Sequence, residues 1–273
     1  VADPAGYDLF VIMSVLVSIS FAPILLSSSP VPVFETTRRM TLKQLFEVSP
    51  LGCVGMFLLG TTFGCLFGMG SVYAAALGLT TVEISIFVGI IYVGGMVCQI
   101  PIGWFSDRID RRLLIMIVTV IGAAAGLGAT LVEGFVPLVV MAFVIGGMAN
   151  PLYSLLAAYV NDYLEHEDMA SASGGMILLN GIGALSAPVA VGYVMAWFGN
   201  GGFFLFITVA FSLTALYAAF RMTQRPTVPV TETGPMVAMS PVASPVATDV
   251  AWEAAIEAEQ EAAAGESEAA VTG

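Results

Sequence analysis

Seven long apolar stretches restrict what this chain can fold into more than any other feature of its sequence. Each holds about twenty residues or more, the length that a helix needs to cross the hydrocarbon core of a bilayer, and none has a charged residue in its interior. Hydrophobic residues make up 58% of the chain and charged residues only 10%, whereas a soluble domain carries about a quarter charged residues. The sequence therefore predicts an all-α, polytopic membrane helix bundle with seven transmembrane helices, over residues 9–27, 51–77, 84–105, 113–132, 137–160, 174–198 and 202–220.

The basic residues predict how these spans are oriented, because short cytoplasmic loops are enriched in Lys and Arg. When residues 30–50 are placed in the cytoplasm and the spans alternate from there, all eight basic residues fall on the cytoplasmic side. They are Arg38, Arg39, Lys43, Arg108, Arg111, Arg112, Arg221 and Arg225. The opposite side, which includes the N-terminus, then carries acidic residues and no cation. We therefore expect residues 30–50 and the C-terminal tail in the cytoplasm.

Two segments differ from the spans in composition. Residues 30–50 begin Pro-rich and continue as a short amphipathic stretch that includes Leu42 and Leu45, which is typical of a helix lying along the membrane surface. Residues 223–273 form a tail, first rich in Pro, Val and Thr and then in Ala and Glu, for which we expect disorder. The alternative for its Ala/Glu-rich end, WEAAIEAEQEAAA, is a transient helix that docks on a partner. Much of the net charge of −12 lies in this tail, and the chain has no basic surface that would bind nucleic acid.

One short cytoplasmic loop concentrates charge between two apolar spans. The sequence GWFSDRIDRR, residues 103–112, contains Asp107, Arg108, Asp110, Arg111 and Arg112. Gly103 allows close helix contact at the membrane edge. Asp107 or Asp110 can cap the following helix, whose free N–H groups and positive dipole end favour an anion. The arginines can pair with the aspartates or reach lipid phosphates.

The spacing of this loop resembles the signature of the major facilitator superfamily, G-x-x-x-D-R-x-G-R-R, which joins the second and third helices of each six-helix half. Here the loop joins the second and third of the six spans that follow residues 30–50. The stretch NGIGALSAPVAVGYVM, residues 180–195, is similar to the eleventh helix of such transporters. The stretches SPLGCVGMFLLGTTFGCLFGMGSVYA and YVNDYLEHEDMASAS are similar to a YcaD-like bacterial branch of the family.

The resemblance implies a major-facilitator half-fold. Residues 1–29 would be the last helix of a missing N-terminal half, 30–50 the interdomain linker, 51–222 the six-helix C-terminal half, and 223–273 an acidic cytoplasmic tail. It implies a secondary active transporter of a small solute in the bacterial cytoplasmic (inner) membrane, working by alternating access, with the lipid bilayer and the missing half as partners. As half of such a protein, the chain is expected not to transport alone. No cofactor and no metal site is expected.

The resemblance also implies that the loop is a cytoplasmic gate, formed by Gly103, Asp107, Arg108, Asp110, Arg111 and Arg112. In the family the loop aspartate pairs with the start of the eleventh helix, so Asp107 is expected to face residues 169–175. Asp110 occupies the second glycine position of the signature, and we expect it to cap the next helix instead of forming a glycine turn. The alternative is that the three arginines only anchor the loop on the cytoplasmic side.

In this family the first and fourth helices of each half line the substrate cavity, which here are residues 51–77 and 137–160. The polar and aromatic candidates for substrate contact are Thr61, Thr62, Ser71, Tyr73, Asn150, Tyr153 and Ser154, with Gln99 and Asn180 as further polar groups at membrane depth. For each of them the alternative is a structural role, because Ser and Thr often bond to their own helix backbone and Tyr often lies at the membrane interface.

Ionisable groups are absent from the interior of these spans, so the acid that couples transport to protons lies in the missing half, or transport is uncoupled. A polar cluster follows the span 137–160: Asp162, Glu165, His166, Glu167 and Asp168. We expect it to be a solvated loop, with His166 as a pH sensor as the alternative.

Other functional classes fit the sequence less well. The main alternative is a non-transporting membrane scaffold or assembly partner on the same half-fold. A retinal photoreceptor needs a lysine in a span, whereas the single lysine, Lys43, lies in the linker. An enzyme is not expected, because no nucleophile–base pair or metal cluster is evident. Cys53, Cys65 and Cys98 lack paired ligand spacing and are expected to be small buried hydrophobes.

Overall fold

The computed structural model describes residues 7–20, 40–224, 234, 236–239, 251 and 254–255. The chain forms two compact units, Val1–Thr36 and Thr37–Gly273. The first contains α1 (Asp8–Ser20), an apolar helix whose large side chains are exposed. This helix corresponds to the first part of the predicted span 9–27. Residues 21–27 of that span, and residues 30–39 of the predicted linker, lie outside the described residues.

The second unit begins with a short amphipathic helix, α3 (Leu42–Val48), where the sequence predicts one. Its first turn is fixed by a capping box, in which Thr41 and Gln44 satisfy each other's backbone N–H groups. Leu45 is buried, while Phe46 is half exposed. One face of α3 thus packs on the bundle and the other stays uncovered.

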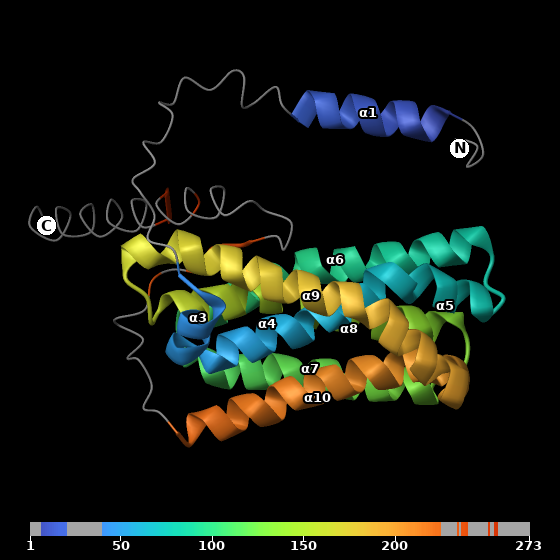
Figure 1. Cartoon of the computed structure of the whole chain (residues 1–273). Coiled ribbons are helices and arrows are strands. Elements are labelled where there is room, and N and C mark those ends of the chain that lie inside the picture. The colour runs from blue at the N-terminus through green and yellow to red at the C-terminus, as the bar shows by residue number, and fades with distance from the viewer. Residues whose placement is uncertain are drawn as a thin grey trace, which may run out of the picture. The chain divides into compact units, whose positions relative to one another are not determined.

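The remaining helices run back and forth along one direction (Figure 1). The first crossing is not a uniform α-helix: it is divided into an α-helix, a π-helical segment and a second α-helix. A continuous α-helix was expected over residues 51–77, so the π-helical segment η1 is an unpredicted feature. In chain order the elements are α4 (Pro50–Phe63), η1 (Gly64–Met69), α5 (Gly70–Ala76), α6 (Thr81–Ser106), α7 (Arg111–Leu131), α8 (Phe135–Asn161), α9 (His166–Phe198), the 3-10 turn η2 (Gly199–Gly201) and α10 (Gly202–Met222).

Five helical stretches of the described chain are long and apolar enough to cross a membrane. The first is formed by α4, η1 and α5 together, and the next three are α6, α7 and α8. The fifth extends over 55 residues, Asp168–Met222. It contains α9 except for its first two residues and the whole of α10, and the 3-10 turn η2 folds these two helices back on each other (Figure 1). The polytopic all-α bundle is therefore confirmed, whereas the total of seven crossings stays a prediction.

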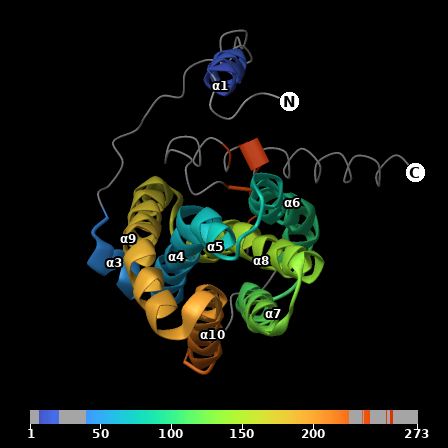
Figure 2. The ribbon, with the colours of Figure 1, turned by 90° about the vertical axis from the view of Figure 1, so that its right-hand side faces the viewer.

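Viewed along the helices, α4, α5 and α8 lie in the middle of the bundle and α6, α7, α10 and α9 lie around them (Figure 2). The most extensive helix contact is between α6 and α8, and it depends on glycine. A Cβ on Gly146 would lie 2.2 Å from the carbonyl oxygen of Ile91, and a Cβ on Gly94 would lie 2.1 Å from that of Phe143. Small residues let helix backbones approach in this way, and packing rather than hydrophobicity then drives association in lipid.

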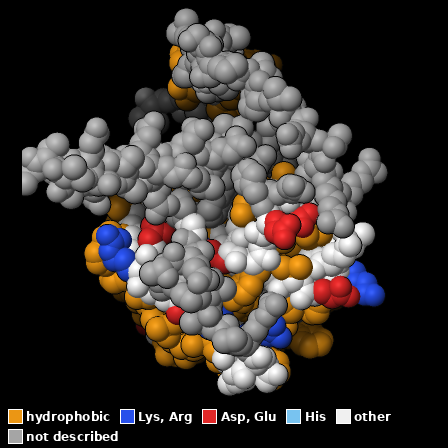
Figure 3. Space-filling model, turned by 90° about the vertical axis from the view of Figure 1, so that its left-hand side faces the viewer, with side chains coloured by type: hydrophobic (Ala, Val, Ile, Leu, Met, Phe, Trp, Pro, Cys, Tyr) orange, Lys and Arg blue, Asp and Glu red, His pale blue; other side chains and the backbone are white. Residues whose placement is uncertain are grey.

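Charged side chains gather at the end of the bundle where α3 lies (Figure 3). This end carries the loop between α6 and α7, the loop between α8 and α9, and the end of α10. Every basic residue of the described chain lies there: Lys43, Arg108, Arg111, Arg112 and Arg221. The alternation of the helices therefore places the predicted cytoplasmic loops together at one end.

Candidate functional site

The loop between α6 and α7 is built from two helix ends. Asp107 is the C-cap residue of α6, and Asp110 is the N-cap residue of α7. The Asp110 carboxylate accepts a hydrogen bond of 2.9 Å from the backbone N–H of Arg112 and pairs at 3.0 Å with the Arg112 guanidinium. The predicted cap at Asp110 is confirmed. The loop therefore turns on an aspartate cap where the family signature has a glycine.

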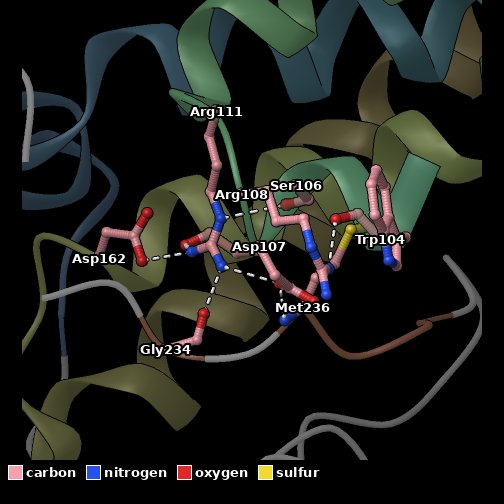
Figure 4. Close-up of polar contacts among 9 residues, drawn as sticks. Trp104, Ser106, Asp107, Arg108, Arg111, Asp162, Gly234 and Met236 are labelled. Carbon is pink, nitrogen blue, oxygen red and sulfur yellow. Dashed lines mark hydrogen bonds and ion pairs between the residues drawn. The ribbon is translucent and has the colours of Figure 1, made fainter. Parts of the chain in front are cut away.

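Arg111 is the centre of the polar contacts at this end (Figure 4). Its side chain is only 2% exposed, yet each nitrogen of the guanidinium has an acceptor. The Nε group donates to Ser106 at 3.2 Å, Nη1 donates to the carbonyl of Ala158 at 3.2 Å and to the carboxylate of Asp162, and Nη2 donates to the carbonyl of Gly234. One buried cation thus joins α6, α7, the end of α8 and the tail.

Asp162 follows the last residue of α8, and its side chain is 4% exposed. The prediction of a solvated loop is wrong for this residue, because its carboxylate is buried against Arg111. Burial raises the pKa of Asp162 to about 6: the loss of hydration outweighs the stabilisation by Arg111, and the carboxylates of Asp107 and Asp110 add repulsion. The side chain of His166, the alternative pH sensor, lies outside the described residues.

Asp107 lies at the exposed edge of this network. Its Oδ1 atom is 3.7 Å from Nη2 of Arg111 and accepts a hydrogen bond of 2.9 Å from the backbone N–H of Met236. Arg108 turns away and covers the ring of Trp104, with its guanidinium carbon 4.1 Å from the ring centroid. The close contact expected at Gly103 is not formed, since a Cβ built there meets no described atom within 4 Å.

The start of α9, which Asp107 is expected to face, is contacted by the linker instead. Ser171 accepts a hydrogen bond of 2.7 Å from the backbone N–H of Met40. A Cβ on Gly175 would lie 2.8 Å from Leu45 of α3. In this structure the linker therefore packs on the start of α9, while the tail pairs with Asp107.

Four of the predicted cavity residues point into the interior of the bundle. Thr61 and Thr62 are buried and donate to the carbonyl of Leu58 on their own helix, at 2.7 and 3.2 Å. Tyr73 stacks on Phe203 of α10 with 4.4 Å between ring centroids. Asn180 on α9 donates to the carbonyl of Met56 on α4 at 3.2 Å. These contacts are structural, and the substrate role of these residues stays a prediction.

The other candidates, apart from Ser71, lie on or near the contact between α6 and α8. Asn150 donates to the carbonyl of Gly146 at 2.9 Å, Tyr153 is buried, and Ser71 is exposed near the far end of the bundle. Ser154 accepts from Gln99 of α6 at 3.3 Å. The structure thus brings Gln99 and Ser154 together, two residues that the sequence places 55 positions apart.

Two features of the site were not predicted. The burial of Asp162 could have been inferred from the need of a buried arginine for an anion at the same membrane side. No sequence pattern predicts the contacts of tail residues 234 and 236–239, because the hydrogen bonds of this segment are made by its backbone groups. Among the residues that the structure describes, no group of His, Cys, Asp and Glu could hold a metal ion.

Comparisons with known proteins agree with this arrangement. The model of the Major Facilitator Superfamily matches residues 52–257. Two proteins named "Uncharacterized MFS-type transporter YcaD", from Escherichia coli O9:H4 strain HS and Escherichia coli strain SE11, are each similar to this chain, with 24% identity over 170 residues. The match covers 61% of this chain and 42% of each relative. The chain therefore spans well under two thirds of the length of these relatives.

Proposed function

The chain belongs to the major facilitator superfamily, a family of membrane transporters, and from this premise we propose that it works as one half of a secondary active transporter. The predicted resemblance, including its YcaD-like bacterial branch, is confirmed. The protein is a multi-pass protein of the bacterial inner membrane and belongs to a family of transporters. Relatives named as transporters do not favour the scaffold alternative.

The proposed activity is the movement of a small solute across the membrane by alternating access. In such a mechanism one helical half rocks against the other around a site near the bilayer midplane. Residues 51–222 would supply the second half, residues 1–29 the last helix of the first half, and residues 30–50 the cytoplasmic linker. The preceding helices of the first half would form the substrate cavity together with α4, α5 and α8, which would line it on one side.

The observation that carries the proposal is the network around Arg111. It ties the ends of α6, α7 and α8 through one buried guanidinium, and Asp107 stands at its edge with 40% of its side chain exposed. We propose that Asp107 forms a latch with the start of α9 when the cytoplasmic side is closed. In this structure its carboxylate accepts from the backbone of Met236, so the latch requires that contact to open, while Arg111 is paired with Asp162.

The latch is tested in the full-length protein, this chain together with its missing half. Single cysteines replace Gly174 at the cytoplasmic start of α9 and Ser71 at the far end. Both positions have room for a side chain, because a Cβ on Gly174 meets no described atom within 4 Å and Ser71 is exposed. Asp107→Asn should speed maleimide labelling at position 174 and slow it at position 71.

The matched control is Glu47→Gln. Glu47 lies at the same end of the bundle and pairs with Lys43 at 3.8 Å, but both side chains are largely exposed, and such surface pairs contribute little. This variant should leave both labelling rates unchanged. If Asp107→Asn also leaves both unchanged, the latch is refuted.

A further inference from the structure

Four backbone contacts hold a short part of the tail against the bundle; we call residues 234 and 236–239 the tail segment. The carbonyl of Gly234 accepts from Arg111, and the N–H of Met236 donates to Asp107 at 2.9 Å. The N–H of Met239 donates to the hydroxyl of Ser154 at 2.8 Å, and that hydroxyl donates to the carbonyl of Met239 at 3.2 Å. The tail segment thus runs from the loop between α6 and α7 onto α8.

Ser154 uses its complete hydrogen-bonding capacity in this contact. A hydroxyl has one donor and two acceptor positions. The donor is used on the carbonyl of Met239, and the acceptors receive the N–H of Met239 and the amide of Gln99. Because Ser154 is only 1% exposed with the tail segment in place, removal of that segment would uncover a polar pair between two transmembrane helices, α6 and α8.

The position of Ser154 along α8 indicates the environment of the face that Gln99 of α6 and Ser154 of α8 form. Ser154 precedes the end of α8 at Asn161 by two helical turns, which is about 10 Å along the helix axis. Non-helical backbone is tolerated at such depth only where it is buried in protein or lines a water-filled cavity. The tail segment is not helical, so the face around Gln99 and Ser154 is turned toward protein or a cavity and not toward the lipid.

The composition of the tail segment matches this place. Residues 234–239 read GPMVAM and carry no charge, although the tail around them is acidic. Met236 and Met239 pack against the buried core, whereas Ala238 between them is exposed. The polar contacts all go to the backbone of the tail segment. The face therefore binds an extended, uncharged peptide through its main chain.

We propose that the α6–α8 face with Asp107, Arg111 and Ser154 is a peptide-docking site and that the chain's own tail segment is its occupant. The segment acts as a strap: it enters from the end where the charged loops lie, covers Ser154, and holds the carboxylate of Asp107. Its regulatory consequence rests on the proposed function, since a strap in this place prevents closure of the cytoplasmic side and keeps Asp107 from the start of α9.

The docking is tested without any measurement of transport, in the 273-residue chain with its three native cysteines replaced by alanine. Single cysteines at the neighbouring positions Met239 and Ala238 serve as reporters in permeabilised membranes. Both keep the backbone groups of the tail segment intact. Maleimide should label the cysteine at position 239 at least about tenfold more slowly than the one at 238, because two hydrogen bonds must open first.

Ser154→Ala should bring the rate at position 239 to within about twofold of the rate at 238. Ser173→Ala is the matched control, because Ser173 is also a buried serine but donates to Met169 on its own helix at 2.9 Å; it should leave the protection in place. Asp107→Ala provides a second, exposed anchor whose loss should also raise the rate at position 239, in case Ser154→Ala impairs folding.

Equal rates at positions 238 and 239 in the parent chain would overturn the docking. Protection that survives both Ser154→Ala and Asp107→Ala would overturn the assignment of the site. Either result leaves the proposed transport function standing, and a chain that fails to transport can still show the protection.

Discussion

The contact between α6 and α8 gives the sharpest test of the fold, through the substitution Gly146→Ala. The added methyl carbon would lie 2.2 Å from the carbonyl oxygen of Ile91 and 2.6 Å from its Cα atom. Both are backbone atoms in the middle of α6, so no side-chain rotation relieves the clash. The helices have to separate by roughly 1 Å to reach ordinary contact, and overpacking of this kind destabilises by about 1–3 kcal/mol.

The assay is thermal unfolding of the purified chain in mild detergent. A change of 1 kcal/mol shifts the Tm by about 2–4 °C for a domain of this size, so Gly146→Ala should lower it by about 2–12 °C. Gly181→Ala in α9 is the control with the opposite sign. A Cβ at Gly181 meets no described atom within 4 Å, and alanine is the better helix former by about 1 kcal/mol, so the Tm should rise slightly.

If Gly146→Ala raises the Tm as Gly181→Ala does, the backbone of α8 does not lie against Ile91. That result would refute the described packing of α6 against α8. It would also refute the face formed by Gln99 and Ser154, which depends on that packing.

Three further predictions concern the loop cluster and the activity. Because burial raises the pKa of Asp162 from about 3.8 to about 6, the folded protein favours the protonated acid. The stability that this protonation contributes is fully present below about pH 4 and is lost as the pH rises through 6. The Tm should therefore rise on acidification from about pH 7 to pH 5, and Asp162→Asn should flatten that part of the profile; an unchanged slope would contradict the burial. Asp110→Ala removes a helix cap and should cost about 1 kcal/mol, whereas Asp110→Asn, which keeps a capping oxygen, should cost less; equal losses of Tm would argue against the cap. Proteoliposomes that contain this chain alone should show no solute flux above empty liposomes, and substrate-dependent flux from the chain alone would refute the half-transporter proposal.

The general architecture could be predicted from the sequence because it depends on length, apolarity and the placement of charge. The apolar stretches predict the helices, and the arginine-rich loop predicts which helix ends meet. Asp110 was recognised as a cap because capping depends on local sequence. Gly60 and Gly64 form a small-x-x-x-small pair, and in the structure their Cβ positions face the carbonyls of Asn180 and Ala184, at 2.1 and 2.2 Å.

What could not be predicted depends on contacts between distant residues. Asp162 lies in a polar stretch that resembles a solvated loop, and only the approach of Arg111 makes it a buried partner. Tyr73 is as plausible in a cavity as in an aromatic cluster until α10 is placed beside it. The tail segment binds through backbone groups, which every residue except proline presents alike, so its composition gives no indication of where it docks.

The π-helical segment η1 affects the orientation of side chains on α5, the helix that follows it. A π-helical turn spans five residues per hydrogen bond where an α-helical turn spans four, so Gly64–Met69 contains in effect one additional residue. One residue corresponds to about 100° of rotation about a helix axis. Everything beyond η1 is therefore offset by that angle, and this phase brings the ring of Tyr73 parallel to Phe203 and edge-on to Phe204, with 4.4 and 5.2 Å between centroids. Deleting a single residue from η1 would restore a uniform α-helix and rotate Tyr73 away from both phenylalanines.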